Sequence, residues 1–167
     1  MITREQALKL LEEVGVPPDV IEHSKFVAKK SVELAKKLSV PVDIQLVEIG
    51  ALLHDIGRSQ THGIDHGIKG GIILRERGLP EFAEFAENHI GVGISKEDAA
   101  KLGLPKKNYI PRTIEQKIVC FVDFLTDGTH MMSFAEALRK LKDSVGPNHP
   151  AIKRAEELNQ EIAALTC

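Results

Sequence analysis

The sequence predicts an all-α protein, a bundle of helices around one core. Apolar residues recur at helical spacing along most of the chain, and no convincing run shows the alternation of a β-strand. The hydrophobic fraction of 43% is enough for a real core. A length of 167 residues suits one domain of ordinary size. We therefore expect residues 1–167 to form a single helical domain.

Residues that favour helix ends divide the chain into elements. Thr3 and Gln6 have the spacing of a capping box. Pro17 and Pro18 end the first helix and open the second, and we interpret Gly57 as a left-handed cap that ends the third. The third helix is apolar around its whole circumference, so we expect it at the centre. The expected helices cover residues 3–15, 18–38, 42–56, 65–78, 80–89, 95–103, 113–125, 133–141 and 150–165.

Composition argues against several classes of partner. Aromatic residues make up only 4% of the chain, too few for the stacking platforms of a single-strand binder. The net charge is −2 and the basic residues are scattered, which predicts no nucleic acid duplex as partner. No apolar run approaches the roughly 18 residues needed to cross a bilayer, and the N-terminus lacks a signal-peptide core. We expect a cytoplasmic protein without a membrane partner. The sequence is compatible with a homo-oligomer.

The pair His54-Asp55 is placed at the expected end of the apolar third helix. Imidazole nitrogen and carboxylate oxygen are ligands that Zn, Fe, Mn, Co and Ni accept. A histidine near a helix C-terminus is also favoured by the helix dipole. Taken alone, the pair favours this plainer interpretation.

Asp123 lies in the apolar stretch 118–125, which we expect to form the middle of a helix. A buried carboxylate costs several kcal/mol unless it is paired or coordinates a metal. The alternative is a solvent-exposed helix face that continues to Asp127 one turn later. Neither interpretation is excluded by Asp123 alone.

Taken together, the candidate ligands point to a metal site in the bundle core. Four histidines and two aspartates come from five expected helices and lie close to apolar faces, as they would around a pocket inside a bundle. Six ligands are enough to hold two metal ions with open positions, an arrangement that activates water and binds phosphate oxygens. The candidates are His23, His54, Asp55, His66, His89 and Asp123.

The order H-HD-H-H-D resembles the HD-domain metal-dependent phosphohydrolases, and residues 54–57 have the HDIG form of their signature. Within the two-metal branch, the chain is similar to the YqeK-like hydrolases that split symmetrical dinucleoside polyphosphates, and to uncharacterised archaeal HDIG proteins. The resemblance covers residues 23–127. It implies an HD-domain-like bundle with a core of about 18–127, to which 1–15 and 133–167 add packing helices.

The resemblance also implies roles for individual residues. The first metal would take His23, His54, Asp55 and Asp123, and the second would take Asp55, His66 and His89, so that Asp55 bridges the two ions. Arg58 stands where the family often has lysine. It would act in catalysis and in substrate binding, with a bidentate fork in place of a point charge. Lys69 is a weaker candidate for substrate binding.

Other polar residues near these motifs receive plainer interpretations. We expect His62 to be a solvated loop residue, although it could cover the substrate. His130 and His149 are expected to be exposed in connectors. Arg112 either forms a salt bridge or reaches the pocket. Cys120 is expected to be a small core residue.

The predicted function is that of a metal-dependent phosphohydrolase, which cleaves a nucleotide or related small phosphate ester by a metal-activated water. The cofactors would be two divalent transition metal ions, drawn from Fe, Mn, Co, Ni and Zn, and the partner a small phosphorylated substrate. Two alternatives stay open: a di-iron HD-fold oxygenase and a non-catalytic nucleotide-binding regulatory module. A purely structural zinc site is less favoured because such sites usually use thiolates.

Overall fold

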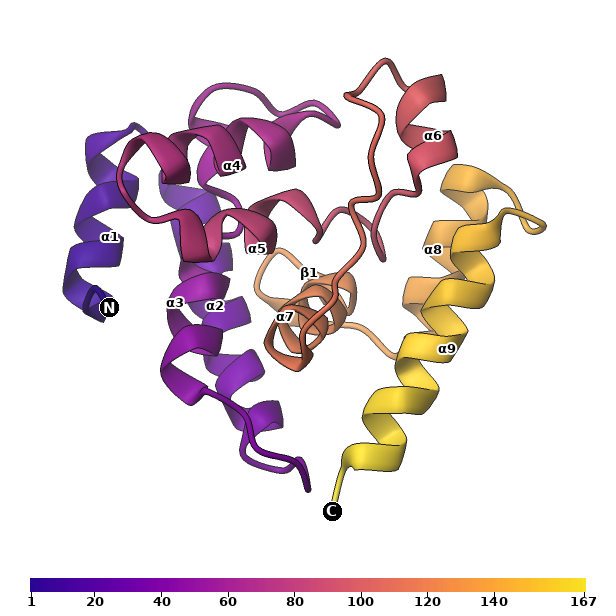
Figure 1. Cartoon of the computed structure of the whole chain (residues 1–167). Coiled ribbons are helices and arrows are strands. Elements are labelled where there is room, and N and C mark those ends of the chain that lie inside the picture. Colours follow the sequence, from indigo (N-terminus) through magenta and orange to yellow (C-terminus); the bar gives the residue numbers. More distant parts are fainter.

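The computed structural model describes residues 1–167 and is built almost entirely of helices (Figure 1). The prediction of an all-α fold is confirmed. The elements are α1 (Arg4–Glu13), α2 (Pro18–Ala35), α3 (Ile44–Leu53), η1 (Ile56–Ser59), α4 (His66–Glu76), η2 (Pro80–Phe82), α5 (Ala83–Glu87), α6 (Lys96–Lys101), α7 (Ile114–Phe124), β1 (Thr126–Asp127), β2 (His130–Met131), α8 (Phe134–Val145) and α9 (Pro150–Leu165). None of the helices has both the length and the apolar character needed to cross a bilayer.

Helix α3 lies at the centre, as its sequence predicts. It packs against α1, α2, α5 and α7, and Val47, Ile49 and Leu52 are almost completely buried. In Figure 1, α7 is seen end-on in the middle, while α8 and α9 form an outer pair on the right. The C-terminal end of α3 is thereby placed inside the bundle, together with the residues that follow it.

The predicted helix starts are close to those observed. Thr3 and Gln6 form both halves of the capping box. At α7 the box is only half formed: the Thr113 side chain accepts from the backbone N–H of Gln116. The Gln116 side chain instead accepts from the backbone N–H of Arg112. Side chains at helix starts thus give reliable start positions even where their second hydrogen bond goes elsewhere.

The expected end of the third helix at residues 56–57 is wrong. Helix α3 ends at Leu53, His54 is its C-cap, and the chain continues after Asp55 into the 3-10 turn η1. Gly57 does not have positive φ and is therefore not a left-handed cap. A Cβ on Gly57 would lie 1.8 Å from the carbonyl oxygen of His66. The glycine is needed for the close approach of η1 and α4.

The region after α7 differs from expectation in two ways. Asp123 lies in the last turn of α7, not in the middle of the helix. The chain then forms a short antiparallel hairpin of β1 and β2, which was not predicted, with Gly128 in the turn at a φ of 62°. Two-residue strands are too short to give an alternating pattern. Helix α2 is also shorter than expected and α8 longer.

Candidate metal centre

The six predicted ligands come together where α3 ends inside the bundle. They are supplied by α2, the turn after α3, α4, the segment after α5, and the last turn of α7. His54, Asp55, His66 and His89 are buried. The side chains of His23 and Asp123 are 17% and 19% exposed, so the cluster opens to solvent on that side.

Asp55 lies in the middle of the four imidazole rings. Its Oδ2 atom is 3.5 Å from Nε2 of His23 and 3.4 Å from Nε2 of His54. Its Oδ1 atom is 3.2 Å from Nε2 of both His66 and His89. One carboxylate therefore faces a pair of imidazoles with each of its oxygens, which is the geometry required of a bridging ligand.

The second carboxylate, Asp123, forms short contacts with only one of these pairs, although it also lies within 4.8 Å of a ring nitrogen of His89. Oδ1 of Asp123 is 2.9 Å from Nε2 of His23 and 3.2 Å from Nε2 of His54. The pair of His66 and His89 has Asp55 as its carboxylate. The candidate donor side chains are thus unequally distributed, with two carboxylates beside His23 and His54 and one beside His66 and His89.

Backbone carbonyls fix the orientation of all four imidazoles. Each Nδ1 atom lies 2.5 to 2.8 Å from a carbonyl oxygen: His23 from Gly128, His54 from Ala51, His66 from Gly63 and His89 from Ala86. A carbonyl oxygen only accepts, so each Nδ1 must donate. The four Nε2 atoms are left to face the centre, as in metal-binding histidines oriented by an outer partner.

The carbonyl partners were not predicted. For His54, His66 and His89 the partner is the residue three positions earlier, a local pattern that spacing could have suggested. Gly128 contacts His23 across 105 residues through the hairpin turn. Nothing in the sequence around Gly128 indicates this contact.

The residues fit a divalent transition metal. Oδ1 of Asp55 is buried and has no hydrogen-bond partner, which is costly for a carboxylate oxygen. Nε2 of His66 and Nε2 of His89 lie 3.1 Å apart, so two ring nitrogens turn towards the same point. Coordination would satisfy these atoms together, and a set of nitrogen and oxygen donors suits Mn, Fe, Co, Ni and Zn.

Burial opposes ionisation of the central groups, but the opposite charges around them prevail. Burial alone would lower the pKa of His54, yet Asp55 and Asp123 raise this pKa well above 6.5. Burial alone would raise the pKa of Asp55, yet His54, His66 and His89 hold it well below 3.8. The charged forms of His54 and Asp55 therefore stabilise each other in the metal-free cluster. Metal binding to the ring nitrogen of His54 requires loss of its proton.

A cavity of about 660 Å³ opens beside the cluster. It is lined by Asp19, Val20, Glu22, His23, Asp55, Arg58, His62, Gly128 and Thr129. Arg58 lies at the wall of the cavity, with Nε 3.6 Å from Oδ1 of Asp55. His62 is exposed, as expected of a loop residue, and it also lines the cavity. Lys69 does not line the cavity.

The remaining polar residues are placed away from the cluster. Arg112 forms a salt bridge with Glu84 at the surface, the first of its two expected roles. His130 is exposed, as expected. The expectation for His149 is wrong, because it is the N-cap of α9 and its Nε2 lies 3.0 Å from Asp98.

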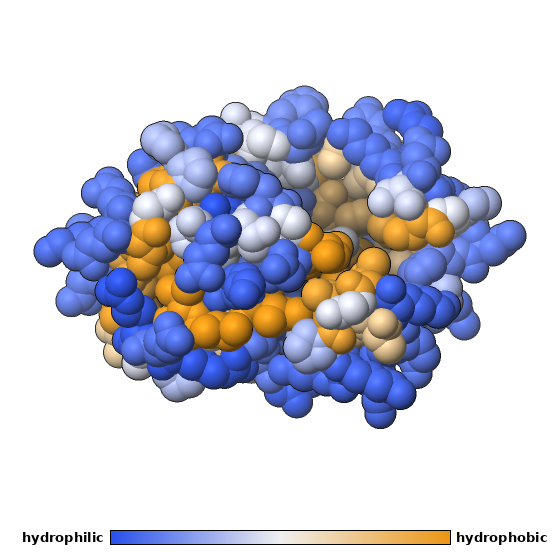
Figure 2. Space-filling model, turned by 90° about the horizontal axis from the view of Figure 1, so that it is seen from above, coloured by the Kyte–Doolittle hydropathy of each residue, from blue (hydrophilic) through white to orange (hydrophobic).

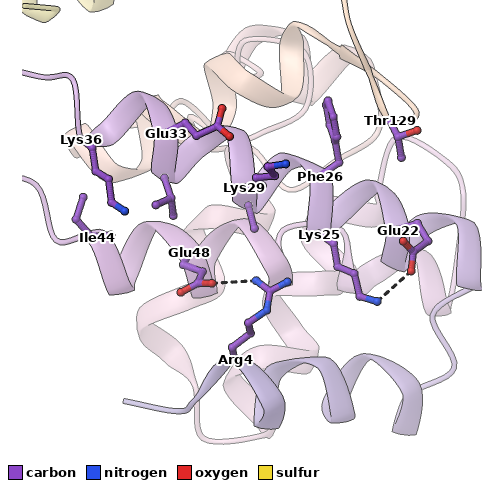
Figure 3. Close-up of a pocket in the computed structure, with 12 residues that line it drawn as sticks. Arg4, Glu22, Lys25, Phe26, Lys29, Glu33, Lys36, Ile44, Glu48 and Thr129 are labelled. Atoms are coloured by element: carbon purple, nitrogen blue, oxygen red, sulfur yellow. Dashed lines mark hydrogen bonds and ion pairs between the residues drawn. The ribbon is translucent and has the colours of Figure 1, made fainter.

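A larger groove of about 880 Å³ runs between α1, α2 and α3. Figure 3 shows two ion pairs in its lining: Arg4 contacts Glu48, and Lys25 contacts Glu22. The groove has no histidine in its lining, but it shares Glu22 and Thr129 with the cavity beside the metal cluster. The smaller cavity, which is lined by the candidate ligands His23 and Asp55, is therefore the candidate site.

Comparison with known families and proteins agrees with this geometry. The model of the HD domain family matches residues 20–126. An uncharacterised protein of Methanocaldococcus jannaschii is 48% identical over 95% of this chain and 95% of its own length. The tRNA (cytidine(56)-2′-O)-methyltransferase of Picrophilus torridus is 36% identical over 96% of this chain, but only 46% of the relative is covered. The enzyme of that name from Thermoplasma volcanium is 44% identical over 78% of this chain and 38% of its own length. The chain thus spans less than half of these two relatives.

Solved structures with the same fold are also found. The HD domain of the L. monocytogenes phosphodiesterase PgpH is similar with a TM-score of 0.55 and 21% identity, covering 95% of this chain and 96% of the other. The same domain in complex with cyclic-di-AMP gives a TM-score of 0.56 and 20% identity, covering 96% and 95%. This likeness extends the shared fold over nearly the whole chain.

Proposed function

This chain belongs to the HD domain family, and from that premise we propose that it is a metal-dependent phosphohydrolase acting on a nucleotide or related small phosphate ester. One observation carries the proposal: the Asp55 carboxylate lies between two pairs of imidazole nitrogens and has a buried oxygen without a hydrogen bond. The open cavity with Arg58 beside it gives a phosphate access to this point.

The proposed ligand assignment follows the two pairs of rings. His23, His54, Asp55 and Asp123 would hold one divalent ion, and Asp55, His66 and His89 a second. When bound, such ions supply Lewis-acid chemistry that polarises a phosphoryl group and activates water. We propose Mn, Fe, Co, Ni or Zn as the metals, since the donors suit each of them.

The chain's own residues have separable tasks in this proposal. Asp55 joins the two halves of the centre, and the backbone carbonyls keep the ring nitrogens aimed at it. Arg58 lines the cavity next to Asp55 and would bind the non-bridging oxygens of the phosphoryl group through its fork. Its charge would stabilise the negative charge that grows in the transition state. Asp19 and Glu22 line the same cavity and disfavour an unshielded polyanion there.

A nucleotide is the favoured substrate class. The cavity of about 660 Å³ is within the range of small-molecule sites. The solved HD domain of PgpH was obtained with a cyclic dinucleotide, which supports a nucleotide ligand for this fold. We further propose that residues 1–167 act as one HD-type domain, in which α1, α8 and α9 support the core.

A link to tRNA modification is a second candidate, favoured by two relatives named as tRNA methyltransferases. Because this chain covers less than half of either relative, we do not assign methyl transfer to it. We infer instead that a domain of this type can serve beside a methyltransferase. Transfer RNA therefore belongs among the substrates to be tried.

The test is turnover of a phosphoester panel by protein loaded with each candidate metal. We expect hydrolysis of at least one nucleotide, and loss of it in the His54→Ala variant. Oxygen consumption with a redox-active iron centre and no hydrolysis would favour the oxygenase alternative. Nucleotide binding without turnover in fully loaded protein would favour the regulatory module.

A further inference from the structure

A third pocket, of about 440 Å³, lies between α6, α8, the start of α9 and the segments around residues 64 and 90–94. Viewed from above, the surface is hollowed on this side, and apolar residues form much of the lining (Figure 2). Its lining is Ile64, Ile90, Gly91, Val92, Gly93, Ile94, Asp98, Lys101, Leu102, Leu141, Ser144, Val145, His149 and Ala151. None of these residues lines the metal cavity.

Exposed apolar side chains gather at this pocket. Five large hydrophobic residues of the chain are exposed, and three of them line it: Ile64 at 43%, Leu102 at 50% and Val145 at 38%. Each is unfavourable in water by an amount that grows with its apolar area. Exposed apolar side chains that gather around one concave site indicate a binding site, whereas single ones scattered over the surface do not.

The lining also contains polar side chains, and one of them, Asp98, is positioned beside another, His149. Nδ1 of His149 accepts from the backbone N–H of Ala151 at 3.0 Å, so the ring proton is on Nε2. Nε2 lies 3.0 Å from Oδ2 of Asp98, within ion-pair distance. A carboxylate has about four acceptor positions, and this arrangement leaves Oδ1 of Asp98 able to accept from a ligand.

The chemistry of the lining narrows the class of ligand. A pure hydrocarbon would remove water from Asp98 without replacing its hydrogen bonds, and an anionic group beside the carboxylate would be repelled. A flat ring with apolar faces and an N–H donor on its edge satisfies both parts of the pocket. The volume is within the range of small-molecule sites, and three exposed side chains are too few for a stable protein interface of about 800 Å² per partner.

We propose that this pocket binds an amino-substituted nucleobase, with its ring against the aliphatic walls and its exocyclic amino group donating to Asp98. The site is separate from the metal centre, and the inference goes beyond the proposed hydrolysis. It is linked to that centre by the chain, since Ile90 follows His89 directly and Ile64 precedes His66 by two residues. A ligand in the pocket would therefore contact two segments that also contain candidate metal ligands.

The experiment is a titration of the full chain with adenosine, followed through the methyl NMR signals of isoleucine, leucine and valine. Adenosine has no phosphoester, so binding is measured apart from hydrolysis. Purine riboside, which lacks only the amino group, is the matched ligand. We expect signals of Ile64, Leu102 and Val145 to shift, and adenosine to bind about tenfold more tightly than purine riboside because one hydrogen bond to a charged acceptor is lost.

Variants locate the site. Leu102→Gln should weaken adenosine binding. Ile72→Gln should leave it unchanged, because Ile72 is 44% exposed but does not line the pocket. Asp98→Asn should reduce the preference over purine riboside. Equal affinity for the two ligands, equal effects of the two glutamine variants, or no methyl shift at millimolar adenosine would each overturn the proposal.

Discussion

Replacing Gly57 by alanine tests whether the HDIG turn is built on a close backbone contact. The added Cβ would lie 1.8 Å from the carbonyl oxygen of His66 and 2.6 Å from the backbone nitrogen of Gly70. Contacts of a Cβ below 3.0 Å are essentially never seen. Both atoms belong to the backbone of α4, so no side-chain rotation relieves the clash. Helix α4 must move by more than about 1 Å, and His66 must move with it.

The expected cost follows from this displacement. Overpacking of a rigid contact typically destabilises by about 1 to 3 kcal/mol, and a backbone clash of this size belongs at the upper end. A shift of about 1 Å in a ligand can lower the rate roughly 100-fold. We therefore expect a urea midpoint below that of the wild type, fewer metal ions per chain, and a roughly 100-fold lower kcat/KM on any substrate found.

Gly63→Ala is the matched control. Its Cβ would lie 3.0 Å from a side-chain oxygen of Asp65 and 3.3 Å from that of Thr61, both of which can adjust. This variant should resemble the wild type in all three measurements. If Gly57→Ala also kept the stability and metal content of the wild type, the close-contact argument would be refuted.

Three further perturbations concern the centre itself. Asp55→Asn should remove most bound metal, because it replaces the carboxylate that faces both imidazole pairs; elemental analysis that still finds two ions per chain would contradict the bridging role. Arg58→Ala should raise KM for a phosphorylated substrate roughly tenfold at unchanged metal content, with partial rescue by Arg58→Lys; a change in metal content instead would make Arg58 a structural residue. In chelator-treated protein, the raised pKa of His54 stabilises the fold below pH 6.5 and this contribution is lost as pH rises through the folded-state pKa. The lowered pKa of Asp55 stabilises the fold above pH 3.8, and this contribution is lost as the pH falls through the folded-state pKa of Asp55. The midpoint temperature of thermal unfolding of metal-free protein should thus be highest between about pH 4 and 6.5. Added Mn²⁺ should raise this midpoint most at higher pH. A metal-free midpoint that keeps rising above pH 7 would contradict the stabilising roles given to His54 and Asp55.

Local physical chemistry determined much of this protein. Helical spacing predicted the all-α fold, and the apolar circumference of the helix expected at residues 42–56 predicted that it would be central. The side chains of Thr3, Ser95, Thr113 and Ser133 cap helices where their sequence positions indicate. These features depend on neighbours within one helical turn, so the sequence contains all the information they need.

The identity of the six candidate ligands could also be proposed from the sequence, because buried histidine and aspartate need partners. The arrangement of these side chains around one another could not be predicted from the sequence. The two oxygens of Asp55 face different imidazole pairs only because α2, α4 and the segment after α5 approach the end of α3 from different sides. The assumed roles of Gly57 and His149 were wrong for the same reason, since each is set by a contact with a distant segment.

The sequence alone therefore determined the helices, their order and the chemical type of the site. Only the tertiary structure decided that the carbonyl of Gly128 orients His23, that His62 lines the cavity, and that Asp98 faces a separate apolar pocket. The physical reason is the distance along the chain over which each interaction acts. Helix formation and capping are settled within about four residues, whereas the direction of a side chain in a site depends on backbone packing between segments far apart in the chain.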